Sequence, residues 1–226
     1  MPTELVHSWD ISPREAAAIQ NDLRHLVVED NCLGKVQFIA GVDVGYLDNG
    51  RTARAAIALL QYPGLELVEF ATAQSPVRFP YVPGLLSFRE VPVVLKALEG
   101  LQKKPDLLIC DGQGRAHPRR LGLACHLGLL TDIATIGAAK SRLCGRHDVL
   151  AQEKGSWVPL CDGEDIIGIV LRTRTGKNPL FVSIGHKVDL ETAREWVLRC
   201  LTRYRLPETT RWAHRIASGN VRPVLK

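Results

Sequence analysis

The first half of the sequence contains three strand-like segments joined by very short turns, which restricts the chain to a fold with an antiparallel sheet. The segments are residues 37–46, 52–61 and 65–73. Their links, Asp48-Asn49-Gly50 and Tyr62-Pro63-Gly64, are strong turn sequences. Because connections of this length join antiparallel neighbours, the three segments predict a meander.

The segments that follow predict parallel pairing in the same sheet. Residues 106–110 form a continuous apolar run, a helix is expected over 119–130, and a second apolar run covers 133–136. Unbroken apolar runs are typical of strands buried on both faces, and a strand, helix, strand order gives parallel neighbours. We therefore expect an α/β protein with a central mixed sheet, three antiparallel strands and then parallel strands, flanked by helices.

The remaining elements fit one domain covering residues 1–226. A length of 226 residues with 46% apolar composition suffices for one sizeable core. Ser12-Pro13-Arg14-Glu15 is a capping box that begins a helix running toward Val28. The other expected elements are a helical stretch ending near Gly100, a hairpin (165–173 and 179–184), a helix over 189–201 and a last helix after Pro207.

Composition disfavours membrane and secreted proteins. No stretch approaches the roughly 18 uninterrupted apolar residues of a membrane span, and residues 1–10 lack a basic segment followed by an apolar one. The six cysteines are scattered singly, mostly in apolar runs, as expected of reduced core thiols. We expect a cytoplasmic monomer without a membrane partner.

Positive charge is concentrated downstream in two segments, although the net charge is only +5. The first segment carries Arg115, Arg119, Arg120, Lys140, Arg142 and Arg146 against Asp132 alone. The second carries Arg194, Arg199, Arg203, Arg205, Arg211, Arg215, Arg222 and Lys226 against Glu195 and Glu208. Such clusters suit a polyanion such as DNA, and solvated helix faces are the alternative.

Two aspartates are the first candidates for chemistry. Asp43 lies inside an apolar strand-like run, with Gly41 and Gly45 beside it on the same face, which leaves room for an ion and a phosphate. Asp111 closes a buried run, where ligands gather in sheets with parallel strands. An aspartate serving a tight turn is the alternative for Asp111. Asp43 has no turn to serve and would be costly if buried unpaired, so the pair predicts a divalent-metal site.

Glu90 is a third candidate with a competing structural explanation. Ser87-Phe88-Arg89-Glu90 matches a capping box, in which Glu90 would only reach back to the Ser87 amide. Pro92 argues against this, because it would delete a hydrogen bond past the first turn. The helix then either starts later or is kinked, and Glu90 faces the sheet.

A cation and two histidines complete the candidates. Lys140 follows the second buried run, on the same sheet edge as Asp111, and could hold a phosphate or stabilise developing negative charge. A surface lysine before a helix is the commoner case. His117 and His214 are weak signals alone, because a lone histidine is more often structural than a proton carrier.

The segment Phe79-Pro80-Tyr81-Val82-Pro83-Gly84 predicts a stiff aromatic loop. The prolines restrict the backbone, Tyr81 offers a stacking face, and Gly84 allows close approach to a ligand. Such a loop could wedge between bases and fill the gap left by an extruded nucleotide. A buried crossover between layers is the alternative.

Several long blocks occur in a characteristic order along nearly the whole chain. They are Gly41-Val42-Asp43-Val44-Gly45, Pro80 through Glu90, Pro105-Asp106, Asp111-Gly112-Gln113-Gly114, His117-Pro118-Arg119, Ile136 through Leu143 and Arg205-Leu206-Pro207-Glu208. In this order they resemble the endonuclease V family, deoxyinosine-directed nucleases with a ribonuclease H-like fold.

The resemblance implies roles for individual residues. It implies that Asp43, Glu90 and Asp111 bind the catalytic metal, normally Mg²⁺ with Mn²⁺ as substitute. It also implies catalytic or phosphate-contacting roles for His117 and Lys140, and a role for His214, where the family varies between histidine and aspartate. The implied DNA wedge is Pro80, Tyr81, Val82 and Pro83, and the implied hypoxanthine pocket, lined largely by backbone, is Gly84, Leu86, Gly112 and Leu123.

The resemblance further implies metal-assisted hydrolysis of the second phosphodiester bond 3′ of a deaminated adenine in DNA repair, leaving 3′-hydroxyl and 5′-phosphate ends. One alternative keeps the fold but acts mainly on inosine in RNA, or on branched or flapped DNA. Another is a nucleic-acid-binding module with a degenerate site. The intact carboxylates and Lys140 argue against that module.

Overall fold

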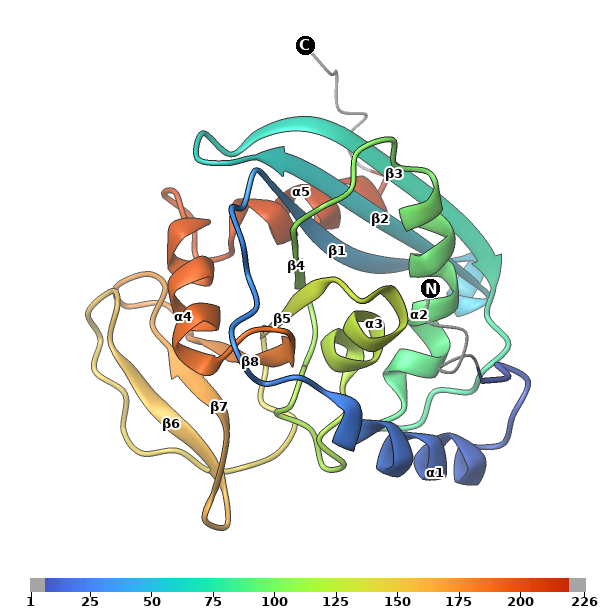
Figure 1. The fold of residues 1–226 in the computed structure, drawn as a ribbon, viewed down its shortest axis with the longest axis horizontal. Helices are drawn as coiled ribbons and strands as arrows, with labels where there is room; N and C mark the ends of the chain where they lie inside the picture. The colour runs from blue at the N-terminus through green and yellow to red at the C-terminus, as the bar shows by residue number, and fades with distance from the viewer. Residues whose placement is uncertain (1–6, 220–226) are drawn as a thin grey trace.

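One sheet of eight strands runs through the computed structural model, which describes residues 7–219 (Figure 1). The strand order is β3-β2-β1-β4-β5-β8-β7-β6. The strands are β1 (Phe38–Leu47), β2 (Thr52–Gln61), β3 (Glu66–Pro76), β4 (Leu107–Cys110), β5 (Ala134–Ala139), β6 (Trp157–Asp162), β7 (Asp165–Leu171) and β8 (Leu180–His186).

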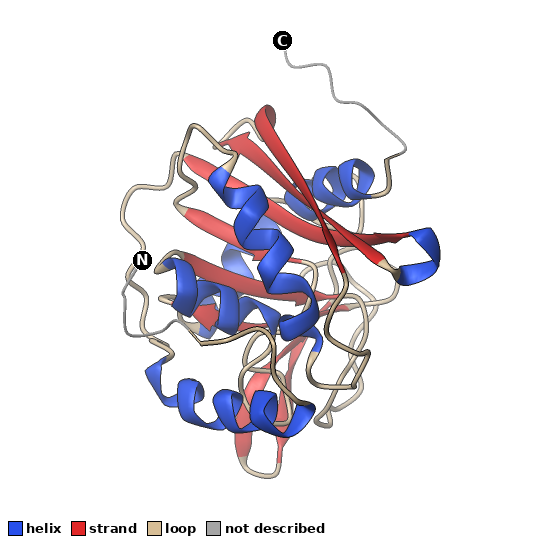
Figure 2. Cartoon of the chain, turned by 90° about the vertical axis from the view of Figure 1, so that its right-hand side faces the viewer, coloured by secondary structure: helices blue, strands red, loops and turns tan. Residues whose placement is uncertain are grey.

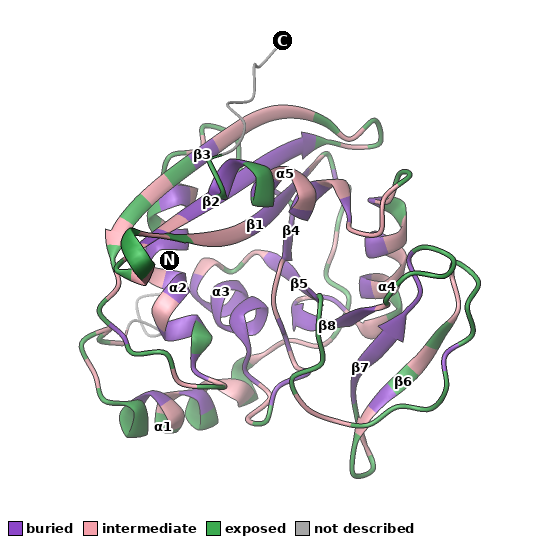
Figure 3. Cartoon of the chain, turned by 180° about the vertical axis from the view of Figure 1, so that it is seen from behind, coloured by how far each residue is buried: buried purple, intermediate pink, exposed green. Residues whose placement is uncertain are grey.

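The pairing confirms the predicted mixed sheet. Strands β1, β2 and β3 form an antiparallel meander, and β4 pairs in parallel with both β1 and β5. Beyond β5 the sheet becomes antiparallel again through β8, β7 and β6. Strand β6 was not predicted. It is a largely exposed edge strand that contains Pro159, and proline inside a run argues against a strand in a sequence (Figure 3).

Helices cover both faces of the sheet (Figure 2). On one face, α2 (Leu86–Glu99) and α3 (Leu123–Thr131) pack on apolar residues of β1, β2 and β4. On the other, α4 (Leu190–Arg199) and α5 (Glu208–Ala217) pack on the alternate residues of the same strands and on the strands beyond them. Because successive strand residues point to opposite faces, the central strands are buried on both, as their unbroken apolar runs predicted.

Helix α1 (Pro13–Leu23) begins at the predicted capping box. The Ser12 side chain accepts a hydrogen bond from the Glu15 amide, and Glu15 accepts one from the Ser12 amide. The helix ends earlier than predicted and is followed by the short 3₁₀ helix η2 (Arg24–Leu26), while a second 3₁₀ helix, η3 (Asp48–Gly50), forms the β1–β2 turn. The helix expected over 119–130 begins only at Leu123.

Two further expectations concern membranes and thiols. Among residues 7–219, the structure contains no helix with the length and apolar character needed to cross a bilayer. All six cysteines carry free thiols, of which Cys110, Cys125 and Cys200 are buried. Cys32 is exposed and therefore is not a core thiol.

Candidate active site

Asp43 and Asp111 lie on neighbouring parallel strands. Asp43 is in β1, and Asp111 directly follows β4, whose last residue Cys110 pairs with Val42. The Asp111 amide donates a hydrogen bond to the Val42 carbonyl at 3.0 Å, which continues the pairing by one step. The two carboxylates therefore meet at one edge of the sheet, as the sequence predicted.

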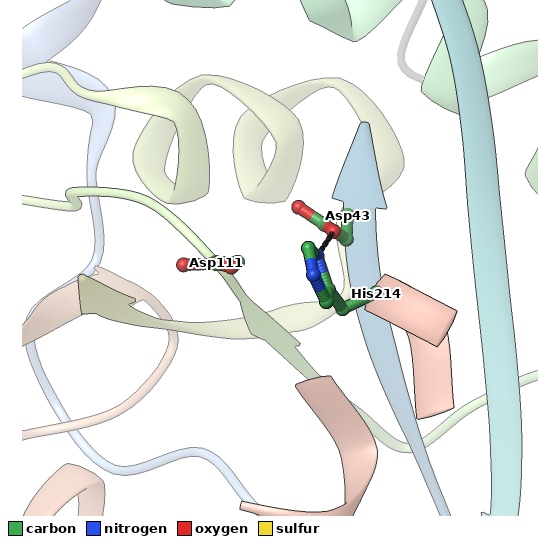
Figure 4. Close-up of side chains that lie close together, drawn as sticks. All are labelled: Asp43, Asp111 and His214. Atoms are coloured by element: carbon green, nitrogen blue, oxygen red, sulfur yellow. Dashed lines mark hydrogen bonds and ion pairs between the residues drawn. The ribbon is translucent and has the colours of Figure 1, made fainter. Parts of the chain in front are cut away.

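A histidine from the last helix joins this pair. His214 lies on α5, and its Nδ1 is 2.8 Å from Oδ2 of Asp43 (Figure 4). Asp43, Asp111 and His214 each offer one possible metal-ligand atom, and these three atoms lie within 4.8 Å of one another. We call these three residues the acidic cluster. It combines two nearly buried carboxylates with an imidazole that is about half exposed.

The glycines beside Asp43 have a different role from the one predicted. A Cβ atom on Gly41 would lie 2.0 Å from the carbonyl oxygen of Thr209, and one on Gly45 would lie 3.1 Å from that of Ala217. Both carbonyls belong to α5, so the glycines allow this helix to lie against β1. The prediction that they leave room for an ion and a phosphate is wrong, because helix backbone occupies that space.

Lys140 lies at the same edge of the sheet as Asp111, as predicted from its position after the second buried strand. It follows β5, and its Nζ forms an ion pair with Oδ2 of Asp111. The Lys140 carbonyl accepts a hydrogen bond from Arg205 Nη2 at 3.2 Å. The ammonium group is partly exposed, so it can contact an incoming anion while remaining next to Asp111.

The electrostatics of the acidic cluster suit a bound cation. Burial, and then the charge of Asp111, raise the pKa of Asp43, while the hydrogen bond from His214 and the charge of Lys140 oppose this rise. The fold thus disfavours the negative charge on Asp43, and a bound cation would offset this. Carboxylate oxygens are the ligands that hard divalent cations prefer, so the residues present fit such an ion.

Glu90 lies close to the cluster but outside the 4.8 Å group. It is buried on α2, and its Oε1 accepts a hydrogen bond from the Tyr46 hydroxyl at 2.9 Å. Burial raises the pKa of Glu90 to about 8, with smaller contributions from Asp43 and Asp111 in the same direction. A divalent cation would favour its ionised form. Its assignment as a metal ligand stays a prediction.

The capping explanation for Glu90 is wrong. Helix α2 begins at Leu86 with Leu85 as N-cap, so Ser87 is already inside the helix. The Ser87 hydroxyl instead bonds to Nδ1 of His126 at 3.0 Å. The helix also does not start later, since Pro92 lies within it. Glu90 therefore points toward β1 instead of serving a helix end.

A cavity of about 370 Å³ adjoins the acidic cluster. The four residues implied as a base pocket, Gly84, Leu86, Gly112 and Leu123, all line it. Asp111 and its ion-pair partner Lys140 line it as well, so the cavity and the acidic cluster share Asp111. Its volume lies in the range of small-ligand sites and suits one nucleobase.

The loop before α2 is anchored at its ends and exposed at its tip. Phe79 and Leu85 are buried in a cluster with Phe88 and Ala16. Tyr81, between them, is 74% exposed and borders the cavity. This exposure excludes the alternative of a buried crossover for the tip. The wedge role of Pro80 to Pro83 stays a prediction.

His117 is buried and bonded to the backbone of this loop. Its Nε2 lies 2.8 Å from the Gly84 carbonyl, and its Nδ1 accepts a hydrogen bond from the Arg119 amide at 3.1 Å. Burial lowers the pKa of His117 to about 4, so the ring is neutral near pH 7. The predicted catalytic or phosphate-contacting role stays a prediction, while the structure places the ring against Gly84.

Four residues of the site were missed by sequence reasoning. Gln20 and Arg119 bond to the Gly84 carbonyl, and Tyr46 bonds to Glu90. Gln113 lines the cavity and donates to the Ser141 carbonyl, while its Oε1 has no hydrogen-bond partner within residues 7–219. Gln20 carried one signal, since it is a polar residue four positions from Ala16 on the apolar face of an amphipathic helix.

Much of the predicted positive surface is compensated internally. Arg115 and Arg120 form ion pairs with Glu29, Asp162 and Asp165. In the second basic segment, several arginines pair within their own helices, as Arg211 does with Glu208. Arg142 and Arg146 are exposed. Arg222 and Lys226 lie outside the described residues.

Comparisons with known proteins agree on one family. A sequence model of the endonuclease V family matches residues 21–215. Endonuclease V of Trichormus variabilis is 56% identical over 214 residues, which are 94% of this chain and 97% of the relative. The crystal structure of endonuclease V from Streptomyces avermitilis superposes with a TM-score of 0.89 at 44% identity, covering 94% of each chain.

A third similar protein was crystallised with nucleic acid. Endonuclease V of Ciona intestinalis, in complex with a 23-mer DNA containing an inosine followed by a ribo-adenosine, superposes with a TM-score of 0.80 at 28% identity. The match covers 93% of this chain and 98% of that one. The similarity therefore extends over nearly the whole fold.

Proposed function

The chain belongs to the endonuclease V family of nucleases that act on DNA, and from this premise we propose that it nicks DNA beside deaminated adenine. The observation that carries the proposal is that Asp111 of the acidic cluster, together with its ion-pair partner Lys140, also lines the cavity. A base held in the cavity brings the phosphates of its own strand toward the carboxylates. Recognition and hydrolysis thus occupy adjoining parts of one site.

The acidic cluster and its neighbours are proposed to carry the hydrolysis. Asp43, Asp111 and Glu90 would hold Mg²⁺, or Mn²⁺ as a substitute, which supplies Lewis-acid chemistry when bound. His214 orients the Asp43 carboxylate through its hydrogen bond. Lys140, paired with Asp111 and partly exposed, is placed to contact a phosphate oxygen and stabilise negative charge that develops there.

The cavity is proposed to hold hypoxanthine extruded from the helix. Helix α2 has no side-chain cap at its N-terminus, and its first residues Leu86 and Ser87 line the cavity. The amide groups of a helix's first turn have no partner within the helix, so they can donate to a base carbonyl. Tyr81, exposed at the rim, would stack in the gap left by the extruded base.

The product proposed is a nick at the second phosphodiester bond 3′ of the lesion, with 3′-hydroxyl and 5′-phosphate ends. Such an enzyme cuts the strand without removing the base. We also propose that the chain acts as a single-domain monomer, which the molar mass of the protein in light scattering tests.

A labelled oligonucleotide carrying one inosine tests the function. With Mg²⁺ or Mn²⁺, the protein should produce one fragment that ends one nucleotide 3′ of inosine. Chelator should abolish cutting, and an adenine-containing control should be cut far more slowly. Fragment length and end-labelling by kinase identify the cut and its 5′-phosphate. Uncut inosine DNA in the presence of metal would overturn the proposal.

The same assay separates DNA from RNA as substrate. Single-stranded and duplex DNA, and an RNA of the same sequence, are cut in parallel reactions at equal enzyme concentration. Faster cutting of DNA supports the proposal. Cutting confined to RNA would support the alternative, a nuclease for inosine in RNA.

A further inference from the structure

The Gly84 carbonyl at the edge of the cavity accepts three hydrogen bonds. The donors are Gln20 Nε2 at 3.0 Å, His117 Nε2 at 2.8 Å and Arg119 Nη2 at 2.9 Å. A carbonyl oxygen has two lone pairs, so this one is fully occupied. It cannot accept a hydrogen bond from a base, and the orientation of its peptide group is fixed from three directions.

The three donors also hold one another. Arg119 Nε donates to Gln20 Oε1 at 2.5 Å, and the Arg119 amide donates to His117 Nδ1. Because Nδ1 of His117 accepts, its Nε2 carries the proton that is donated to Gly84. Gln20 Nε2 additionally donates to the Leu121 carbonyl at 3.0 Å. Gln20 is completely buried, so α1 is joined by polar bonds to the segments on both sides of the cavity.

The peptide held in this way connects the two parts of the recognition site. Gly84 follows the loop that carries Tyr81 and precedes the first turn of α2. Its φ of +78° is a conformation that favours glycine, and a Cβ atom would lie 2.9 Å from Arg119 Nη2. The held carbonyl belongs to the Gly84–Leu85 peptide group, whose Leu85 amide donates to the Val82 carbonyl at 3.0 Å. The Gly84 amide, on the preceding peptide group, donates to no acceptor within residues 7–219.

Packing alone does not require these polar groups. The other buried residue of α1 is Ala16, and the neighbouring cluster consists of Phe79, Leu85 and Phe88. An apolar side chain at position 20 could extend that cluster, whereas a buried glutamine is stable only with all its bonds satisfied. The network is therefore better explained by a need to hold the backbone at Gly84 in one position.

We propose that Gln20 and Arg119 are positioning residues for lesion discrimination, which hold the Gly84 peptide so that the cavity accepts hypoxanthine and rejects adenine. This inference rests on the proposed function and assigns a role to α1. The family match begins at residue 21, so it does not include Gln20. Neither side chain is proposed to take part in the chemistry, because the acidic cluster is built from other elements.

Three substitutions test the proposal by steady-state nicking of inosine and matched adenine oligonucleotides. Gln20→Met preserves approximate volume and removes every hydrogen bond. Gln20→Glu keeps the acceptor for Arg119 but cannot donate to Gly84. Arg119→Lys keeps the charge but removes the planar guanidinium, whose Nε and Nη2 bond to Gln20 and Gly84 in a fixed geometry. Asn21→Ala, an exposed amide on the same helix, is the matched control.

Each test variant should raise KM for inosine DNA and lower the inosine-to-adenine ratio of kcat/KM by about 10-fold, the effect of one lost buried hydrogen bond. The kcat value should stay within about 3-fold, since the acidic cluster is unchanged. The double variant Gln20→Met/Arg119→Lys should lose less than the product of the single losses, because the two residues act together.

Three outcomes would overturn the inference. One is an unchanged ratio and KM in all three variants while the wild type discriminates, which leaves the proposed function intact. Another is an equal loss of kcat on both substrates together with a lower melting temperature, which would indicate a purely structural role. A wild-type protein that does not distinguish inosine from adenine would overturn both the proposed function and this inference.

Discussion

The two ends of the active-site cavity, at the acidic cluster and at Gly84, differ in the chemical groups that form them. At the acidic cluster and the adjoining Lys140, four charged or ionisable side chains come from four different parts of the fold, and two of them, His214 and Lys140, are substantially exposed. At the Gly84 end, a backbone carbonyl is held by three side chains, of which Gln20 and His117 are buried and Arg119 is partly buried.

This difference matches what each end is proposed to bind. A phosphate and a cation are recognised by charge, which acts over several ångströms and tolerates exposed and movable groups. A nucleobase is recognised by hydrogen bonds that fail when a donor moves by a fraction of an ångström. The acidic cluster can therefore be built from side chains at an open edge, whereas the Gly84 end needs a backbone fixed from behind.

The largest expected effect is that of Asp43→Ala, which should abolish the function of the acidic cluster while leaving binding at the Gly84 end intact. Asp43→Ala should lower the single-turnover nicking rate by more than about 100-fold, because loss of an outer-shell partner of a metal alone costs about 10- to 100-fold. Binding of inosine DNA should persist, since the cavity is unchanged. Asp30→Ala, an exposed carboxylate, is the control. Full activity of Asp43→Ala with Mg²⁺ would remove Asp43 from the proposed metal site.

The Gly84 end is tested by Tyr81→Ala. Stacking on one base is worth about 1–3 kcal/mol, so inosine nicking in duplex DNA should fall about 5- to 150-fold. The melting temperature should not change, because Tyr81 is 74% exposed. Val149→Ala, at another exposed apolar residue, is the control. An equal loss on inosine and undamaged duplex would contradict the wedge role.

The dependence of the acidic cluster on α5 can be broken at Gly41. Gly41→Ala places a Cβ atom against the Thr209 carbonyl and should destabilise the fold by about 1–3 kcal/mol, as overpacking does. The displaced helix carries His214, so metal-dependent nicking should fall as well. Gly34→Ala, where no atom lies within 4 Å of the added group, should leave the urea midpoint unchanged. A midpoint for Gly41→Ala equal to wild type would contradict the close approach of α5.

The smallest expected effect is on the pH dependence of stability, and it comes from the neutral His117 at the Gly84 end. Burial lowers the pKa of His117 from 6.5 to about 4, so the unfolded chain takes up a proton at higher pH than the folded one. This contribution to stability is complete above pH 6.5 and is lost as the pH falls toward 4. Gln at position 117 could still donate to Gly84 but does not titrate.

Urea unfolding of wild type and His117→Gln at several pH values measures this contribution. The stability of wild type relative to the variant should decrease between pH 6.5 and 4 and stay constant above 6.5. His126, which is also buried and has its pKa lowered to about 3, is present in both proteins and cancels in the difference. A difference independent of pH would show that His117 is not held neutral by the fold.

Local patterns were sufficient for the charged half of the site. Asp43 and Asp111 could be placed together because alternation locates a residue on a strand and because parallel strands end at one edge. Lys140 followed from the same reasoning. Glu90 was ambiguous, since the capping-box pattern is short and occurs by chance, and only the helix start at Leu86 resolved it.

The sequence by itself determined the order of strands and helices apart from β6, the mixed sheet, the family and the edge at which two carboxylates meet. Only the tertiary structure decided that Gly41 accommodates α5, that His214 reaches Asp43 across 171 positions, and that Gln20 holds Gly84 across 64. Periodicity and turn chemistry act between near neighbours in the chain. Contacts between distant segments depend instead on how layers pack, which no local pattern records.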